Sequence, residues 1–391
     1  MNTSYLSLLI QRQAQKYGER VALKYRDYAT STWIPVSWNQ FSEKVSKVSR
    51  ALVALGVQAQ ENIGVFSQNK PECLYTDFGA FGVRAVTVPL YATSSEAQVH
   101  YILQDAAIRF LFVGEQYQYD VASRVQNLCH TLKRIIVFDS SVKLAPGDTN
   151  SLYYEDFLAL GDNMELQQQV DKLTAESSPQ DLANILYTSG TTGESKGVML
   201  HHSCYEAAFK AHHGRLTTLG EQDVVMNFLP FTHIFERAWS YYCLDRGCVL
   251  CINLRPQDIQ KTIKEVRPTA MCSVPRFWEK VYAGVLEKIN ETTGLKKMLM
   301  LDALKVGKAH NIDYLMNGKT PPAMLRAKYK FYDKTIYSLL KKTIGIENGN
   351  FFPTAGAAIP EKVEEFVHSV GINMVAGLRG SSSGMPASTL P

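Results

Sequence analysis

The sequence predicts an α/β protein made of two layered subdomains with mostly parallel sheets. Short apolar runs of strand length alternate with helix-compatible segments along most of the chain, and this alternation is typical of parallel sheets covered by helices. Apolar residues make up 46% and charged residues 20% of the sequence, close to the averages for soluble globular proteins. The 391 residues exceed what one ordinary core organises, so we expect more than one packed unit.

The first expected element is a helix from Ser37 to Leu55. Ser37 and Gln40 can form a capping box, and apolar residues recur at helical spacing as far as Leu55, before Gly56. Strand-like runs follow, with helix-compatible stretches between several of them, at Ile63–Phe66, Ala85–Leu90, Phe110–Val113 and Arg134–Phe138. We expect these elements to form a first subdomain over residues 1–180.

A second α/β series begins after a polar segment near residue 180. Its strand candidates are Asn184–Thr188, Val224–Leu229, Cys248–Leu254, Ala270–Val274 and Asn350–Thr354. A long Lys-rich stretch, Arg276–Lys342, is helix-compatible apart from a break near residues 318–322. These features predict a second subdomain over residues 181–376, whereas residues 377–391 are rich in Ser, Gly and Pro and form an irregular tail.

Charge and hydropathy exclude several classes of partner. The formal charge of +4 is spread along the chain without a long run of like charges, which gives no support to nucleic-acid binding. The N-terminus lacks the pattern of a secretory signal, and no stretch of 18 apolar residues occurs. We therefore expect a cytoplasmic protein that contacts a membrane only at its surface.

The cysteines and histidines favour structural over metal-binding roles. Cys248 and Cys251 have a C-x-x-C spacing but lie in an apolar run that is typical of a buried strand. Two histidine pairs, His201-His202 and His212-His213, flank a helix-like segment, and neighbouring residues on a helix point to different faces. Zinc or another metal at either place is the less favoured alternative.

The most informative segment is Ile185-Leu-Tyr-Thr-Ser-Gly-Thr-Thr-Gly-Glu-Ser-Lys-Gly-Val198. A strand leads into small, hydroxylated and glycine residues and then into Lys196. Glycines let the backbone approach phosphate oxygens, successive N–H groups can form an anion-binding nest, and the lysine adds a positive charge. The spacing differs from a Walker loop, in which Gly-Lys-Ser/Thr follows the first glycine after four residues. A surface hairpin without a ligand is the alternative.

This segment resembles the signature of the adenylate-forming superfamily, which includes acyl-CoA synthetases, luciferases and peptide-synthetase adenylation domains. Two further segments resemble long-chain acyl-CoA synthetases in particular: Leu229-Pro-Phe-Thr-His-Ile-Phe-Glu-Arg237 and Val274-Pro-Arg-Phe-Trp-Glu-Lys-Val-Tyr282. An earlier segment, Val88-Pro-Leu-Tyr91, also fits that subfamily, and the resemblance covers roughly residues 6–376. The fold it implies is the N-terminal domain of acyl-CoA synthetases.

The resemblance implies the parts of an ATP site. Lys196 and Thr192 would be catalytic, and the loop would hold the β- and γ-phosphates. The small residues of Thr354-Ala-Gly-Ala-Ala358 would pass along the adenine ring. The implied ATP-binding residues are Thr188, Ser189, Gly190, Thr191, Thr192, Gly193, Lys196, Gly356, Ala357 and Ala358.

The resemblance also places an acyl and CoA tunnel beside His233, Phe235 and Arg276. His233 would act in gating and packing, although a hydrogen-bonded core histidine is the alternative.

The similarity stops after Gly377. Similar proteins continue with Tyr-Gly-x-Thr-Glu, whereas this chain reads Leu378-Arg-Gly-Ser-Ser-Ser-Gly384. The glutamate expected to bind Mg²⁺ is missing, as are the ribose-binding aspartate and the C-terminal domain of the family. We therefore expect a truncated chain that makes acyl-CoA poorly. A shifted reading frame and an artificially added tail both stay open as the origin of its ending.

The function implied is AMP-forming activation of a long-chain fatty acid with ATP, Mg²⁺ and CoA. Two alternatives stay open. The chain could adenylate a different carboxylate, such as an aryl or amino acid, although no segment here can be assigned to the aspartate that holds the substrate amine in peptide synthetases. It could also be a non-catalytic ATP-binding or interaction fragment. Acyl chain length and oligomeric state do not follow from the sequence.

Overall fold

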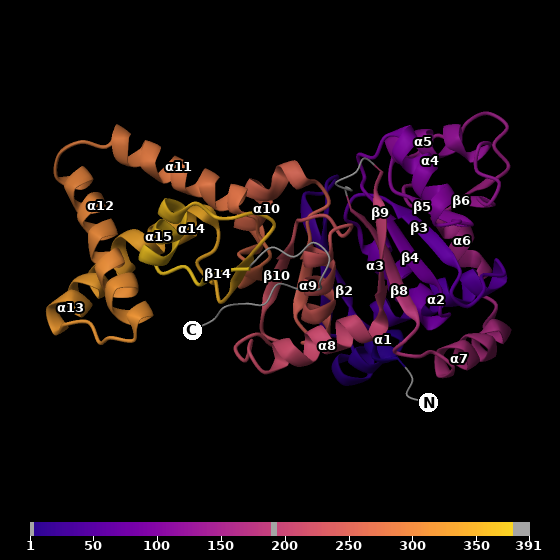
Figure 1. The fold of residues 1–391 in the computed structure, drawn as a ribbon, viewed down its shortest axis with the longest axis horizontal. Helices are drawn as coiled ribbons and strands as arrows, with labels where there is room; N and C mark the ends of the chain where they lie inside the picture. The colour runs from indigo at the N-terminus through magenta and orange to yellow at the C-terminus, as the bar shows by residue number, and fades with distance from the viewer. Residues whose placement is uncertain (1–3, 189–193, 378–391) are drawn as a thin grey trace. The chain divides into compact units, whose positions relative to one another are not determined.

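The computed structural model describes residues 4–188 and 194–377. The chain divides into two compact units, Met1–Thr217 with Pro230–Arg255 and Thr218–Leu229 with Pro256–Pro391, and only their described residues are discussed below. Parallel strands and covering helices occur in both units (Figure 1). The expected α/β class with mostly parallel sheets is thereby confirmed.

The first unit contains a seven-stranded sheet in the order β7-β6-β5-β3-β4-β8-β9. All neighbouring strands are parallel except β8 and β9, which are antiparallel. The strands are β3 (Asn62–Phe66), β4 (Val86–Leu90), β5 (Phe110–Val113), β6 (Arg134–Val137), β7 (Ser151–Tyr153), β8 (Leu182–Thr188) and β9 (Lys196–His201).

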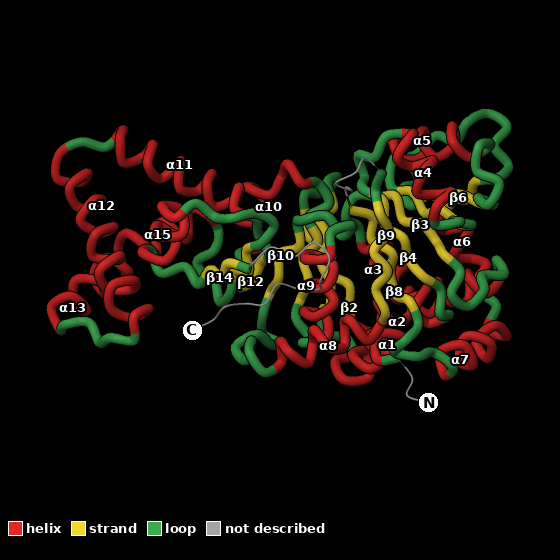
Figure 2. Tube along the Cα trace, viewed as in Figure 1, coloured by secondary structure: helices red, strands yellow, loops and turns green. Residues whose placement is uncertain are grey.

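Helices cover both faces of this sheet (Figure 2). On one face, apolar residues of α4 and α5 join those of the strands in one buried cluster that includes Val88, Leu103 and Val125. On the other face, Phe112 packs edge-on against Phe157 of α6, with ring centroids 5.2 Å apart. The helices of this unit are α1 (Tyr5–Tyr17), α2 (Trp38–Ala54), α3 (Pro71–Gly82), α4 (Glu96–Asp105), α5 (Gln116–Gln126), α6 (Tyr154–Leu160), α7 (Gln167–Ala175), α8 (His202–His213) and α9 (Ile234–Asp245).

The helix expected at the start of the chain is α2. Its capping box is confirmed, because the Ser37 hydroxyl accepts from the Gln40 N–H at 3.2 Å while the Gln40 side chain accepts from the Ser37 N–H at 2.9 Å. A hairpin of β1 (Val21–Asp27) and β2 (Thr32–Ser37), not expected from the sequence, precedes it. Strand β1 also pairs in parallel with β11 (Val249–Ile252), which contains the buried Cys251 of the C-x-x-C spacing.

The second unit contains four short parallel strands. The ladder of β10 (Val224–Asn227) with β12 (Ala270–Met271) and that of β13 (Phe352–Thr354) with β14 (Met374–Ala376) are joined by bridges from Ala270 to Phe351 and from Ser273 to Thr354. The Lys-rich stretch is helical as expected, and its break coincides with Gly318, which has φ +67°. The helices are α10 (Ile259–Val266), α11 (Pro275–Glu291), α12 (Gly294–Gly307), α13 (Ala323–Tyr332), α14 (Ser338–Ile344) and α15 (Glu361–Ser369), with π-helical segments at Lys308–Tyr314 and Asp333–Tyr337.

The units divide the chain differently from the expected boundary at residues 180 and 181. Strand β8 begins at Leu182, but it pairs with β4 through Thr87 and Asn184 and so extends the first sheet. The buried Asn184 amide explains this, because it donates to the Thr87 hydroxyl at 2.5 Å and accepts from the Tyr205 hydroxyl at 2.6 Å. The polar segment before β8 is thus a connection within one unit.

None of the helices in residues 4–188 and 194–377 has both the length and the apolar run that a membrane span requires.

Candidate functional site

The loop with the phosphate-binding composition begins at the carboxyl end of β8. In the antiparallel hairpin of β8 and β9, Thr188 pairs directly with Lys196. The hairpin therefore brings the first hydroxyl and the lysine of the motif together, with the Lys196 side chain exposed. Five residues expected to bind ATP, Ser189, Gly190, Thr191, Thr192 and Gly193, lie outside the described residues.

Helix α4 anchors both ends of this loop. The Tyr187 hydroxyl donates to Asp105 at 2.5 Å, and the Tyr101 hydroxyl donates to the Ser195 carbonyl at 3.0 Å. The rings of Tyr101 and Tyr187 pack edge to face, with their centroids 6.3 Å apart. Burial and the neighbouring Asp105 carboxylate raise the pKa of Tyr187 above its ordinary value, so the phenol stays protonated and keeps its donor role. Nothing in the local sequence pattern pointed to Tyr101 or Asp105.

The carboxyl ends of β3, β4 and β8 lie on the same edge of the sheet, because these neighbouring strands are parallel. Ligands of open α/β sheets bind outside this edge. Asn69 follows β3 and Tyr91 follows β4. The Asn69 side chain accepts from the Phe231 N–H at 2.9 Å, and Tyr91 interacts with the Thr232 side chain. The turn before His233 is thus held at the edge where the phosphate loop begins.

His233 is the N-cap of α9. Its Nδ1 accepts from the Phe235 N–H at 3.2 Å, so Nδ1 carries no proton in this arrangement and Nε2 is the donor nitrogen. Removal of water from part of the ring lowers the pKa of His233 below its ordinary 6.5, which favours the same neutral form. Phe235 is buried in the first turn of α9. The site role of both residues stays a prediction.

A buried ion pair that sequence reasoning missed fixes the start of α9. The Arg237 guanidinium donates to the Asp77 carboxylate at 2.5 Å and to the Phe231 carbonyl at 2.7 Å. Burial alone would lower the pKa of Arg237, but Asp77 and the phenols of Tyr241 and Tyr205 outweigh it and raise that pKa. The guanidinium remains charged and ties the turn before His233 to α3. The sequence offered one signal for this contact, because Arg237 lies one helical turn after His233 in the segment expected to form the site.

The expected adenine turn lies in the second unit, directly after β13. Gly356 has φ +98°, and it is exposed together with Ala357 and Ala358. Beneath the turn, the Trp278 indole donates to the hydroxyls of Ser273 and Thr354 at 2.8 and 2.9 Å. The backbone of this turn is therefore held by buried polar contacts, while its small residues face outward.

Arg276 belongs to the second unit as well. It lies in the first turn of α11, where its side chain is 77% exposed and pairs with Glu279 at 3.4 Å. Thr188, Lys196 and His233 belong to the first unit, whereas Arg276 and Gly356 belong to the second. Their meeting in one cleft stays a prediction.

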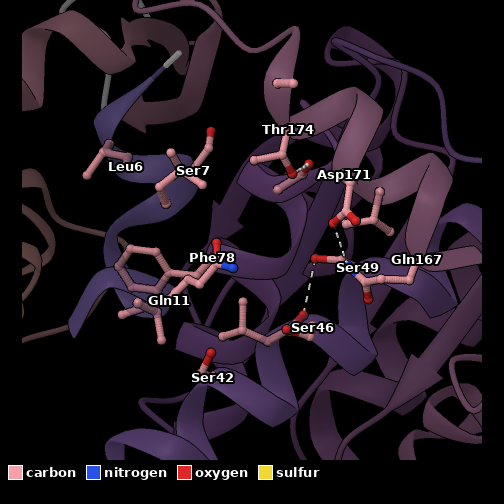
Figure 3. Close-up of a pocket in the computed structure, with 16 residues that line it drawn as sticks. Leu6, Ser7, Gln11, Ser42, Ser46, Ser49, Phe78, Gln167, Asp171 and Thr174 are labelled. Carbon is pink, nitrogen blue, oxygen red and sulfur yellow. Dashed lines mark hydrogen bonds between the residues drawn. The ribbon is translucent and has the colours of Figure 1, made fainter. Parts of the chain in front are cut away.

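A pocket of about 300 Å³ in the first unit contains none of the expected site residues (Figure 3). Helices α1, α2, α3 and α7 supply most of its lining, which includes Ser42, Ser46 and Asp171. The Gln167 amide donates to the Asp171 carboxylate there at 2.8 Å.

In the part of the chain that the structure describes, no group of three histidine, cysteine, aspartate or glutamate side chains could hold a metal ion.

The layered α/β fold, together with a glycine- and hydroxyl-rich loop that ends in lysine at a strand's carboxyl end, defines the adenylate-forming class. Residues 10–388 match the family of AMP-binding enzymes, and the chain belongs to this family. A long-chain-fatty-acid–CoA ligase of Xenopus laevis is 29% identical over 371 residues, which cover 93% of this chain and 49% of that protein. A long-chain-fatty-acid–CoA ligase of Mycobacterium tuberculosis is 27% identical, with 93% and 59% covered. The chain spans about half the length of the curated relatives it matches.

Solved structures show the same fold. The crystal structure of an anthranilate CoA ligase in complex with anthranoyl-AMP superposes with a TM-score of 0.69 at 16% identity, covering 99% of this chain and 65% of that one. The N-terminal domain of a Mycobacterium tuberculosis protein named FACL13, bound to an inhibitor, gives 0.64 at 17% identity, with 97% and 76% covered. The chain therefore shares the fold of the N-terminal part of adenylate-forming enzymes.

Proposed function

We propose that this chain supplies the ATP and acyl sites of an AMP-forming ligase that activates a long-chain fatty acid and transfers it to CoA. The observation that carries the proposal is the pairing of Thr188 with Lys196 at the carboxyl end of β8. This pairing presents a hydroxyl and a positive charge at the edge where α/β proteins bind phosphates. The names of the curated relatives support the fatty acid as substrate.

In the proposed reaction, a carboxylate oxygen bonds to the α-phosphorus of ATP while the bond from that phosphorus to the bridging oxygen breaks and pyrophosphate leaves. Lys196 would stabilise the charge that develops on the departing pyrophosphate. In the second step the CoA sulfur would attack the acyl carbonyl and release AMP. The neutral His233 imidazole, with Nε2 as donor, would lie beside the acyl path.

Mg²⁺ belongs to the proposal as a partner of the triphosphate, because this hard cation prefers phosphate and carboxylate oxygens. We assign it no protein ligand, since the described residues contain no acidic cluster that could hold it alone. The positive charge that the chain itself brings to the phosphates is that of Lys196. Contact with a membrane surface is a further part of the proposal, because long-chain fatty acids partition into bilayers.

Exchange of radiolabelled pyrophosphate into ATP tests the proposal. The chain is incubated with ATP and Mg²⁺ in the presence of palmitate, anthranilate or an amino acid, and ATP binding is measured in parallel by calorimetry. Exchange that depends on palmitate supports a fatty acid ligase. Exchange that depends on one of the other acids transfers the proposal to a different carboxylate, and ATP binding without any exchange favours a non-catalytic nucleotide-binding role.

A further inference from the structure

An exposed apolar surface covers a helical part of the second unit, residues 292–345, which we call the cationic arm. It contains α12, α13 and α14, and its helices α12 and α13 lie away from the strands of that unit (Figure 2). Nine of the sixteen large apolar side chains that are exposed in the described chain belong to it: Leu295, Met298, Leu299, Leu301, Leu315, Met316, Met324, Phe331 and Leu339. Since the arm is 54 residues long, this concentration far exceeds its share of the sequence.

The same segment carries most of the chain's excess positive charge. It holds eleven lysine and arginine residues against three aspartates, a net charge of +8, whereas the whole chain has a net charge of +4. The rest of the protein is therefore net negative, at −4. Among the described residues, no carboxylate lies within ion-pairing distance of Lys296, Lys297 or Lys330. These three lysines are thus available to an external partner, whereas Lys308, Lys328 and Lys341 pair with carboxylates of the chain.

Apolar and basic side chains are interleaved on the helices. Leu295, Met298 and Leu299 have the i, i+3, i+4 spacing of one helix face, and they are 71%, 67% and 40% exposed. Lys296 and Lys297 lie between Leu295 and Met298 in the sequence. On α13, Met324 and Phe331 lie two turns apart on one face and are 84% and 58% exposed.

The arm is held together by its own polar contacts. Asp302 of α12 pairs with Lys328 of α13 at 2.9 Å and accepts from the Tyr332 hydroxyl at 2.5 Å. The Tyr337 hydroxyl donates to the Ala303 carbonyl at 2.6 Å and is buried. The exposed apolar residues therefore belong to an ordered surface with a packed interior of its own.

We propose that the cationic arm docks the protein on an anionic phospholipid membrane. Helices that present apolar residues flanked by lysines bind the interface of a bilayer, where the apolar side chains enter the acyl boundary and the lysines meet anionic headgroups. A second copy of this chain fits the surface less well, because two arms brought face to face would each carry +8. A partner without negative charge would leave the lysines unsatisfied.

This inference names the surface for the membrane contact in the proposed function, but its evidence is independent of the chemistry at Lys196. Each lysine near an anionic surface strengthens binding roughly fivefold. The attraction is screened by salt, since the Debye length is about 8 Å at physiological ionic strength. Binding should therefore require anionic lipid and should weaken as salt is added.

Flotation with vesicles, in the absence of ATP and CoA, tests the inference. The full chain should bind vesicles of phosphatidylcholine with phosphatidylglycerol and bind vesicles of phosphatidylcholine alone at least about tenfold more weakly. The triple variant Lys296→Gln, Lys297→Gln, Lys330→Gln should lose about a hundredfold in affinity for the anionic vesicles. The triple variant Leu295→Gln, Met298→Gln, Met324→Gln should lose the part of the vesicle binding that the unaltered chain retains at high salt.

Matched controls carry the same substitutions on exposed residues of the first unit. The control for the lysine variant is the triple variant Lys143→Gln, Lys172→Gln, Lys210→Gln. The control for the apolar variant is the triple variant Leu128→Gln, Leu160→Gln, Met164→Gln. Both control variants should bind vesicles as the unaltered chain does. Circular dichroism and thermal unfolding establish that each variant is folded. Equal loss in arm and control variants, or no binding to anionic vesicles, would overturn the inference. Self-association in ultracentrifugation that the apolar arm variant abolishes, without lipid binding, would assign the surface to a second copy instead.

Because these measurements need no catalysis, a chain that binds vesicles but shows no pyrophosphate exchange would contradict the proposed function alone. Pyrophosphate exchange without vesicle binding would contradict only the inference that the cationic arm docks on a membrane.

Discussion

Arg237 and Asp77 form an ion pair in which both side chains are 1% exposed and the guanidinium nitrogen lies 2.5 Å from the carboxylate oxygen. The pair joins α9 to α3 across 160 residues of sequence. Through its second bond, to the Phe231 carbonyl, Arg237 also fixes the turn that precedes His233. A charged contact in the core thus determines where the candidate acyl-site histidine lies.

Replacing Arg237 by Met should lower the free energy of unfolding by about 3–5 kcal/mol, because it leaves the Asp77 charge buried without its partner. Chemical denaturation measures this loss. The double variant Asp77→Asn, Arg237→Met should recover part of it. The matched control is Lys47→Met, which breaks a partly exposed pair with Asp162 and should cost about 0–1 kcal/mol. Equal losses for Arg237→Met and Lys47→Met would contradict the structural role given to the buried pair.

Lys196→Ala should weaken ATP binding about ten- to a hundredfold while changing AMP binding little, because the lysine is proposed to contact phosphates that AMP lacks. Calorimetric titration of both nucleotides measures the difference. Lys210→Ala, at an exposed lysine of α8, is the control and should change neither affinity. If Lys196→Ala reduced the affinities for ATP and AMP equally, the change would act through folding of the β8–β9 hairpin rather than through the phosphates.

Gly356→Ala should lower the free energy of unfolding by about 1–2 kcal/mol, because φ +98° is strained for any residue with a Cβ atom. The added Cβ would lie 3.6 Å from a Val274 methyl group, an ordinary contact. If the turn holds the adenine ring, this variant should also bind AMP more weakly. Gly318→Ala has the same kind of strain at φ +67° and should lower stability without affecting AMP. Unchanged AMP affinity in a folded Gly356→Ala chain would remove this turn from the nucleotide site.

Stability should fall as the pH is lowered from about 6.5 to about 4, and His202 should account for part of the fall. Burial lowers the pKa of His202 from 6.5 to about 4 in the folded chain, and its Nδ1 lies 2.8 Å from the Ser4 hydroxyl. Within this window the unfolded chain binds the extra proton, so unfolding is favoured progressively as pH falls and levels off below about 4. The full contribution is roughly 3 kcal/mol.

Denaturant unfolding at several pH values between 4 and 7 should therefore show a steeper pH dependence for the unaltered chain than for His202→Gln. The exposed His130 provides the control, and His130→Gln should keep the steep dependence. Identical slopes for the unaltered chain and His202→Gln would assign the acid sensitivity to other groups.

The sequence by itself determined the elements whose signals are local. The alternation of apolar runs predicted the α/β class, the Ser37 and Gln40 spacing predicted the capping box of α2, and the Asn184–Thr188 run predicted the strand that precedes the glycine-rich segment. Each of these depends on residues within a few positions of one another, where backbone geometry and short hydrogen bonds decide the outcome.

The tertiary structure decided what depends on distant residues. It alone placed β8 beside β4, so that the first unit extends past residue 180, and it alone paired Arg237 with Asp77 and brought the His233 turn to Asn69 and Tyr91. It also showed that leucines and methionines of α12 and α13 face outward beside lysines, although their spacing is that of ordinary packed helices. The physical reason is that burial belongs to the whole packing arrangement. The same Arg, Leu or Lys can be buried or exposed, and only the elements packed around it determine which.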